Sequence, residues 1–228
     1  MSEYGQFCPV AKAMELLDER WTLLVVRELL SGSTRFNELR RGNPKMSPAL
    51  LSKRLRTLER AGVVRRTVDA GRSRYTLTAC GEELGAVVEA LGTWGVRWIG
   101  AIADDDLDPR LLMWDMRRTV PVGAWPAGRT VVAFEFDAAV PDRHWWLCVA
   151  EGEADVCDQD PGFVVSATVR TRLRTLVEIW RGDRSWEQAV AAEAVTISGP
   201  TAITRNVPAW LGQMTLAAVA RPERVNVD

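Results

Sequence analysis

The chain has 228 residues, 47% hydrophobic and 26% charged, with a formal net charge of -1. Its length suits one large domain or two small ones, either of which can bury a sufficient core, and its composition is ordinary for a soluble protein. The composition and the residue pattern also argue against a metal site and against a secreted or membrane-spanning protein.

A metal site is not expected, because the chain has one histidine, His144, and its cysteines form no CxxC pair. The four cysteines are Cys8, Cys80, Cys148 and Cys157. The first ten residues lack the basic and apolar regions of a signal peptide. The most apolar segment, 86–103, contains Glu89 and Arg97 and is a poor membrane span. We therefore expect a cytoplasmic protein with reduced thiols and no membrane partner.

Positive charge is concentrated in one segment. Between Arg35 and Arg74 there are twelve Lys or Arg residues and three acids. A basic segment in a nearly neutral chain predicts a polyanion as the partner of that segment alone.

The pattern before residue 47 predicts three helical stretches. Residues 8–30 are expected to be helical in two runs, 8–17 with an apolar stripe and 21–30 after it. Thr34 is expected to cap a short helix that ends near Leu39, and a Gly-Asn-Pro break follows at 42–44.

The segment from Ser47 to Gly62 is the longest basic helix that the sequence predicts. Ser47 offers an N-cap hydroxyl, Pro48 fits the first turn and Gly62 is a C-terminal stop. Leucines at 51, 55 and 58 form an inward stripe, which leaves small residues and then cations on the other face. Such a helix fits the major groove of DNA, and the alternative is a solvated surface helix.

A hairpin is expected after this helix, with strands at 63–68 and 73–77 and a turn at 69–72. A short helix, a turn, a longer basic helix and a hairpin make a winged helix-turn-helix. The alternative for the hairpin is a basic decoration without function. The expected DNA-binding residues are Arg35, Ser47, Ala49, Ser52, Lys53, Arg54, Arg56, Arg60, Arg72 and Arg74.

Thr78 is expected to cap a long helix that continues to about Ile102 with a broad apolar stripe. Gly85, Gly92 and Gly95 weaken such a helix, so packing against a neighbour is expected to compensate. We expect this helix, together with the helix at 8–17, to form the interface of a homodimer; the alternative is that it packs on the C-terminal half of the chain.

Residues 8–98 resemble the HxlR family of winged-helix regulators. The matching segments are 8–10 (CPV), Trp21, 32–39 (GSTRFNEL), 51–59 (LSKRLRTLE), 62–64 (GVV) and 75–81 (YTLTACG). The resemblance implies dimeric, sequence-specific DNA binding. In some members the cysteine that precedes the first helix acts in redox or electrophile sensing. The resemblance implies that Cys8 occupies this position in the present chain. Many members are little longer than the winged domain, whereas this chain continues well beyond it.

The second half is expected to form a separate α+β domain. The acidic segment 104–109 is the expected linker, between a DNA-binding and dimerisation domain at 1–103 and an effector-binding domain at 110–228. We expect strands at 129–137, 145–150, 163–168 and 195–198, and helices at 111–117, 169–180, 185–192 and over most of 201–220. The order of features at 151–155, 176–182 and 198–200 resembles a sterol-carrier-protein-type domain, which implies an apolar tunnel for a lipid-like ligand.

Tryptophans are concentrated beyond this linker, and they suggest an effector pocket. The expected lining residues are Trp114, Trp125, Trp145, Trp180 and Trp210. The alternative is that they form an aromatic core. Arg170, Arg172 and Arg174 are compatible with an anionic ligand head or with a solvated helix face.

No catalytic constellation is present: the sequence shows no nucleophile elbow near His144 and no glycine-rich phosphate loop. We expect no enzyme and no cofactor. The leading hypothesis is a homodimeric regulator that binds a near-palindrome with half-sites roughly 34 Å apart and responds to an apolar ligand. The alternatives are a thiol-based sensor acting through Cys8, and a lipid carrier or enzyme whose winged domain is an interaction module.

Overall fold

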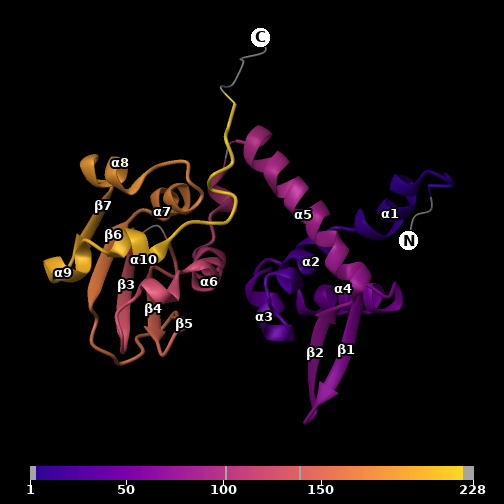
Figure 1. Ribbon diagram of the computed structural model, residues 1–228, viewed down its shortest axis with the longest axis horizontal. Coiled ribbons are helices and arrows are strands. Elements are labelled where there is room, and N and C mark those ends of the chain that lie inside the picture. Colours follow the sequence, from indigo (N-terminus) through magenta and orange to yellow (C-terminus); the bar gives the residue numbers. More distant parts are fainter. Residues whose placement is uncertain (1–3, 101, 139, 223–228) are drawn as a thin grey trace. The chain divides into compact units, whose positions relative to one another are not determined.

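The computed structural model describes residues 4–100, 102–138 and 140–222. Contacts divide the chain into two compact units, residues 1–94 and 95–228, with the division inside one long helix, α5 (Ala79–Trp98; Figure 1). The expected linker 104–109 holds a short 3-10 helix, Asp104–Asp106, and Asp108, which caps the next helix by accepting hydrogen bonds from the N–H groups of Arg110 and Leu111.

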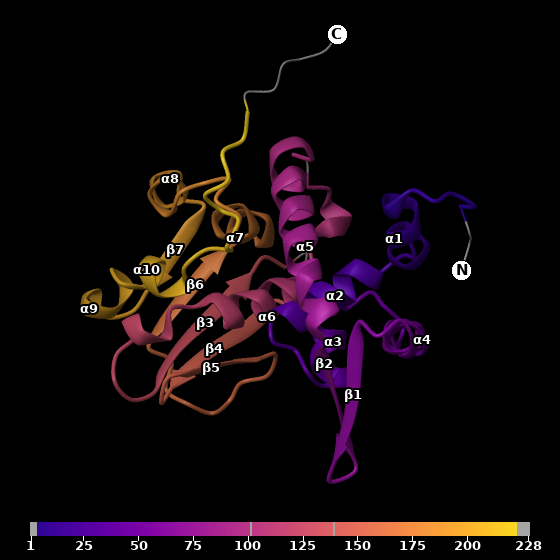
Figure 2. The same cartoon turned by 45° about the vertical axis from the view of Figure 1, so that its right-hand side comes forward.

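The amino-terminal unit is a winged helix-turn-helix, as predicted. Its elements are α1 (Pro9–Leu17), α2 (Thr22–Leu30), α3 (Phe36–Arg41), α4 (Pro48–Arg60), β1 (Val64–Asp69), β2 (Arg72–Leu77) and α5 (Ala79–Trp98). Figures 1 and 2 both show the β1–β2 hairpin projecting away from the helices of this unit.

Helix α4 forms where its sequence signals lie. The Ser47 hydroxyl accepts a hydrogen bond from the N–H of Leu50 at 3.3 Å, and Pro48 occupies the first turn. Its leucine stripe is 0–2% exposed and belongs to the core of the unit, together with residues of α2, α3 and β1. The burial of one stripe fixes which face of α4 remains outside.

The hairpin closes with a two-residue turn. Ala70 and Gly71 both have positive φ, 47° and 75°, which matches the right-handed twist of a tight hairpin. Strands β1 and β2 pair in antiparallel register from Val64–Leu77 to Asp69–Arg72. The N–H of Tyr75 donates to the carbonyl of Thr34 at 2.7 Å, so the base of the wing is tied to the segment before α3.

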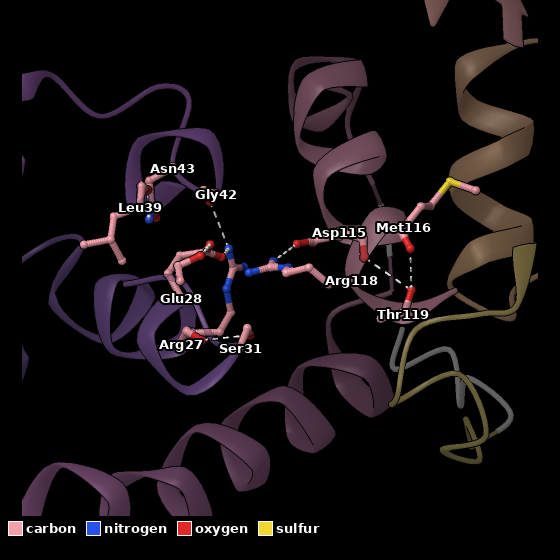
Figure 3. A network of polar contacts seen from close by, with 11 residues as sticks. Arg27, Glu28, Ser31, Leu39, Gly42, Asn43, Asp115, Met116, Arg118 and Thr119 are labelled. Atoms are coloured by element: carbon pink, nitrogen blue, oxygen red, sulfur yellow. Dashed lines mark hydrogen bonds and ion pairs between the residues drawn. The ribbon is translucent and has the colours of Figure 1, made fainter. Parts of the chain in front are cut away.

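A buried carboxylate organises the space between α2 and the end of α3 (Figure 3). Glu28 is fully buried, and it pairs with Arg27 at 2.8 Å and accepts a hydrogen bond from Ser33. Arg27 also donates to the carbonyl of Gly42 at 3.0 Å. A Cβ added at Gly42 would lie 1.8 Å from a carboxylate oxygen of Glu28, so this glycine is required by close approach.

Two details of this unit differ from expectation. Helix α3 begins at Phe36, after Arg35, and the Glu38 carboxylate accepts hydrogen bonds from the N–H groups of Thr34 and Arg35 in place of a Thr34 cap. Helix α5 ends at Trp98, earlier than the expected Ile102. Thr78 does cap it, accepting from the N–H of Gly81 at 3.4 Å.

The carboxy-terminal unit is an α+β fold around a five-stranded sheet. Its strands are β3 (Thr130–Phe136), β4 (His144–Ala150), β5 (Glu153–Cys157), β6 (Ala167–Thr171) and β7 (Val195–Ser198). The order is β5-β4-β3-β6-β7, with β3 and β6 parallel and the other neighbours antiparallel. Its helical elements are Asp104–Asp106, α6 (Pro109–Thr119), the 3-10 turn Val122–Ala124, α7 (Leu173–Trp180), α8 (Trp186–Ala191), α9 (Thr201–Thr204) and α10 (Val207–Leu211).

Three expectations for this unit are wrong. The strand expected at 163–168 lies at Ala167–Thr171, so the helix expected from 169 starts at Leu173. Strand β5 was not expected. The helix expected over most of 201–220 is limited to α9 and α10.

The tryptophans expected to line an apolar pocket largely fill the interior. Trp125, Trp145 and Trp210 are 5–7% exposed and belong to the hydrophobic core. Trp125 stacks on Trp210 with ring centroids 5.0 Å apart and donates to the Trp210 carbonyl at 3.1 Å. Trp114 is also buried, with the guanidinium groups of Arg117 and Arg118 over its ring, and Trp180 is half-buried against the core. The aromatic-core alternative therefore describes these residues better than an open apolar pocket.

Replacing Gly42 by alanine is expected to destabilise the amino-terminal unit by about 1–2 kcal/mol, because the fully buried Glu28 carboxylate must shift away from the added Cβ. Amide exchange of peptides from α2 and α3 should then be roughly 5- to 30-fold faster. Gly85→Ala is the control, because the nearest atom to its added Cβ is 3.5 Å away and helix propensity improves. Equal exchange rates in Gly42→Ala and wild type would contradict the packing role of Gly42.

Candidate nucleic-acid interface

The outer face of α4 presents small residues first and cations after them. Ala49, Lys53, Arg56 and Arg60 follow one another at spacings of three and four, and all four are exposed. They therefore lie on one stripe, on the side of α4 away from its buried leucines. Lys53 and Arg56 form no ion pair within the part of the chain that the structure describes.

The first turns of α4 carry small side chains, one of which is the N-cap of the helix. Ser47 is exposed, although its hydroxyl is engaged as the N-cap of α4. Ala49 adds no bulk, and Ser52 is half-buried beside the exposed stripe. The first turn of α4 therefore leaves room for a close approach of another molecule.

Arg54 does not belong to this surface, which corrects the expectation. Its side chain is 7% exposed, its guanidinium pairs with the Glu19 carboxylate, and its Nε donates to the carbonyl of Arg20 at 3.0 Å. These partners lie in the segment between α1 and α2. Arg54 thus anchors α4 to that segment and is unavailable to a polyanion.

One face of the wing carries a row of cations. The register places Arg65 opposite Thr76, Thr67 opposite Arg74 and Asp69 opposite Arg72. Because side chains alternate along strands, Arg65, Arg72 and Arg74 share a face, and all three are exposed. Arg65 was missing from the expected site, although the alternation of the strand would have included it. Arg66 lies on the other face, where it donates to Ser73 at 2.9 and 3.0 Å.

Arg35 and Arg60 complete the exposed cations that the sequence predicts for this surface. Arg35 is the exposed residue immediately before α3. The guanidinium of Arg60 folds back to the carbonyl of Arg56 at 3.3 Å and to the Thr57 hydroxyl at 3.4 Å. Of the twelve bases between Arg35 and Arg74, all but Arg54 are exposed, so the positive charge of this segment is available to solvent.

Two helices of the amino-terminal unit expose apolar side chains. Val10 and Met14 of α1 are 69% and 37% exposed. On α5, Val87, Leu91 and Trp94 are 42–55% exposed. Contiguous exposure of this kind marks an association surface more often than a solvated one.

Cys8 precedes α1 directly, with Pro9 in the first turn, and it is partly exposed with a free thiol. The other thiols lie elsewhere: Cys80 is exposed near the start of α5, and Cys148 and Cys157 are half-buried on β4 and β5. Burial raises the pKa of Cys148 to about 11, with contributions from Cys157 and Asp155.

No helix among the described residues is long and apolar enough to cross a membrane. Within the same residues, the His, Cys, Asp and Glu side chains form no group of three suited to a metal ion.

Known proteins resemble the amino-terminal part of this chain, which carries the surface described above. Residues 16–103 match the model of the HxlR-like helix-turn-helix family. The HTH-type transcriptional regulator YvaP of Bacillus subtilis is 39% identical over 99 residues, which cover 42% of this chain and 92% of YvaP. The HTH-type transcriptional regulator sll1512 of Synechocystis is 38% identical over 100 residues, which cover 42% of this chain and 74% of that protein.

Similar solved structures include the reduced form of the transcriptional regulator YodB from B. subtilis, which is 32% identical and covers 42% of this chain and 97% of YodB, with a TM-score of 0.37. The matches to YvaP and sll1512 leave more than half of the present chain without a counterpart. On the evidence of its winged helix-turn-helix, this chain belongs to the HxlR-like helix-turn-helix family of DNA-binding transcriptional regulators.

Proposed function

We propose that this regulator binds duplex DNA in a sequence-specific manner, with α4 in the major groove and the wing against the flanking backbone or minor groove. The observation that carries the proposal is the exposed stripe of α4, where Ala49 precedes the unpaired cations Lys53 and Arg56. Small side chains allow a helix to approach base edges, and cations behind them meet phosphates.

The wing supports the same orientation. Its cationic face adds Arg65, Arg72 and Arg74 to the positive surface, and the hairpin is tied to the base of the helix-turn-helix through Tyr75 and Thr34. In this proposal Ser47, Ala49, Ser52 and Lys53 lie nearest the bases, and Arg35, Arg56, Arg60, Arg65, Arg72 and Arg74 mainly contact phosphates.

We further propose that the protein acts as a homodimer through the apolar faces of α1 and α5. Paired units would present two α4 helices to half-sites roughly 34 Å apart on a near-palindrome. Family membership also favours a regulator over a lipid carrier or enzyme that uses the winged unit as an interaction module. A response to an apolar ligand stays a prediction. Most of the tryptophans expected around its pocket are packed in the core and do not support it.

Arg56→Ala tests the DNA-binding face. Loss of one phosphate contact should weaken binding roughly eightfold at about 0.1 M salt and reduce the salt slope by about 0.9. The probe is an operator recovered by in vitro selection, with a random-sequence duplex of equal length beside it, and both should weaken alike. Binding is measured by fluorescence anisotropy at several salt concentrations.

Arg54→Ala is the matched control for this variant. It removes a neighbouring arginine that is buried and paired, so we expect a loss of about 1–3 kcal/mol in stability rather than a change in salt slope. An unchanged slope in Arg56→Ala, or a change equal to that of Arg54→Ala, contradicts the proposed face.

Leu91→Glu tests the homodimer, because it places a charge in the exposed apolar face of α5. The mass in solution, measured by light scattering, should fall from that of two chains to that of one. Val68→Glu is the control: Val68 is an apolar residue that is more exposed than Leu91, at 63% against 50%, but it lies on the wing. The dimer surface is wrong if wild type is already a single chain or if Leu91→Glu still pairs.

A second candidate function is thiol-based sensing through Cys8, which the position of its free thiol at the start of α1 favours. We expect diamide to release wild-type protein from DNA and Cys8→Ser to resist it. Cys80→Ser controls for an exposed thiol elsewhere, and Cys148 should contribute little because its raised pKa keeps it protonated at neutral pH. Full release of Cys8→Ser by the oxidant rules this function out.

A further inference from the structure

The carboxy-terminal unit has a polar hollow that the proposed DNA-binding function does not use. It measures about 660 Å³ and is lined by the ends of β3 and β6, the start of α7 and the segment 192–194 between α8 and β7. In Figures 1 and 2, α7 and α8 lie together at one end of the sheet. The carboxyl ends of parallel strands are a common place for ligands, and the volume suits a small molecule.

The first turn of α7 opens toward this hollow. Arg172 is its N-cap and provides no side-chain hydrogen bond to the helix. The first N–H groups of a helix lack intrahelical partners, and this end carries partial positive charge. Thr171, Arg172 and Thr175 line the hollow, so the uncapped end of the helix borders it.

Thr175 adds a second polar group at the same place. The residue is 6% exposed, yet its hydroxyl makes no hydrogen bond to any residue that the structure describes. Because Thr175 lines the hollow, this is where its hydroxyl can find a partner. The hydroxyl is not among the fully buried side-chain atoms that lack a partner, so it reaches solvent through the hollow, where it can exchange a hydrogen bond with a ligand oxygen.

The three arginines that line the hollow differ in whether they have a carboxylate partner. Arg170 is neutralised by two contacts with Glu135, and Arg184 lies 3.8 Å from Glu178. Arg172 is exposed and forms no ion pair in the described part of the chain. Its charge is therefore available to an anion beside the start of α7.

The hollow also contains carboxylates that restrict what fits. Asp137 and Glu193 line it and are exposed. They repel a ligand that is negatively charged throughout, and they favour an amino group or hydroxyls at the end away from Arg172.

We propose that this hollow binds a small molecule with one anionic group, a carboxylate or a phosphate, held by Arg172, the first turn of α7 and the Thr175 hydroxyl. The ligand class is thus polar and anionic rather than apolar. The site lies wholly within the carboxy-terminal unit, so the inference stands whether or not the amino-terminal unit binds DNA.

The test uses the full chain, labelled with nitrogen-15, and follows amide shifts during titration at constant ionic strength. The probes are inorganic phosphate and acetate, with chloride as the reference anion. At least one probe should give saturable shifts concentrated at residues 171–176. Saturation by phosphate alone assigns a phosphorylated ligand, and saturation by acetate assigns a carboxylate.

Variants make the assignment specific. Arg172→Ala and Thr175→Val should each weaken the saturable binding at least fivefold, while Thr175→Ser, which keeps the hydroxyl, retains it. Arg205→Ala is the control, because Arg205 is an exposed arginine of the same unit that does not line the hollow. Shifts that grow linearly with both probes, or that weaken equally in Arg205→Ala, overturn the proposal.

Discussion

The burial of the leucine stripe of α4 is the constraint on which the amino-terminal unit depends. Leu51, Leu55 and Leu58 are 0–2% exposed, so α4 cannot rotate about its axis without exposing core side chains. Arg54 adds a polar anchor on the margin of the same helix. A helix held in this way has one outer face, and in this chain that face carries Ala49, Lys53 and Arg56.

The second constraint is the space between α2 and the end of α3. The Glu28 carboxylate lies against the backbone of Gly42, and Arg27 holds both the carboxylate and the Gly42 carbonyl. This arrangement fixes where α3 stops and where the chain turns toward α4. The geometry of the helix-turn-helix therefore depends on an ion pair with a buried carboxylate and a partly exposed arginine, as well as on apolar packing.

In the carboxy-terminal unit the apolar and polar side chains occupy separate places. Its large aromatic side chains are used to build a core, as the Trp125–Trp210 stack illustrates. The space left for a ligand lies at the carboxyl ends of β3 and β6, where the lining is polar. The proposed site for a small polar ligand and the surface proposed for DNA therefore belong to different units of the chain.

Local signals explain what could be predicted from the sequence. The N-cap of Ser47, the leucine period of α4 and the tight turn at Ala70–Gly71 are each contained in a few neighbouring residues. The burial of Arg54 depends on Glu19 and Arg20, far away along the chain, and no local pattern reveals it. Composition likewise shows that tryptophans gather in the second half, but whether they line a cavity or fill a core depends on tertiary packing. The short, partly polar strand β5 was missed for the same reason, since its place at the sheet edge comes from pairing with β4.

The central claim is that the outer face of α4 meets DNA bases, and site-specific photocrosslinking tests it most directly. A benzoylphenylalanine at position 53 should crosslink to bases of a selected operator, whereas the same group at position 205 should not. Crosslinks from position 205 with none from position 53 would contradict the account.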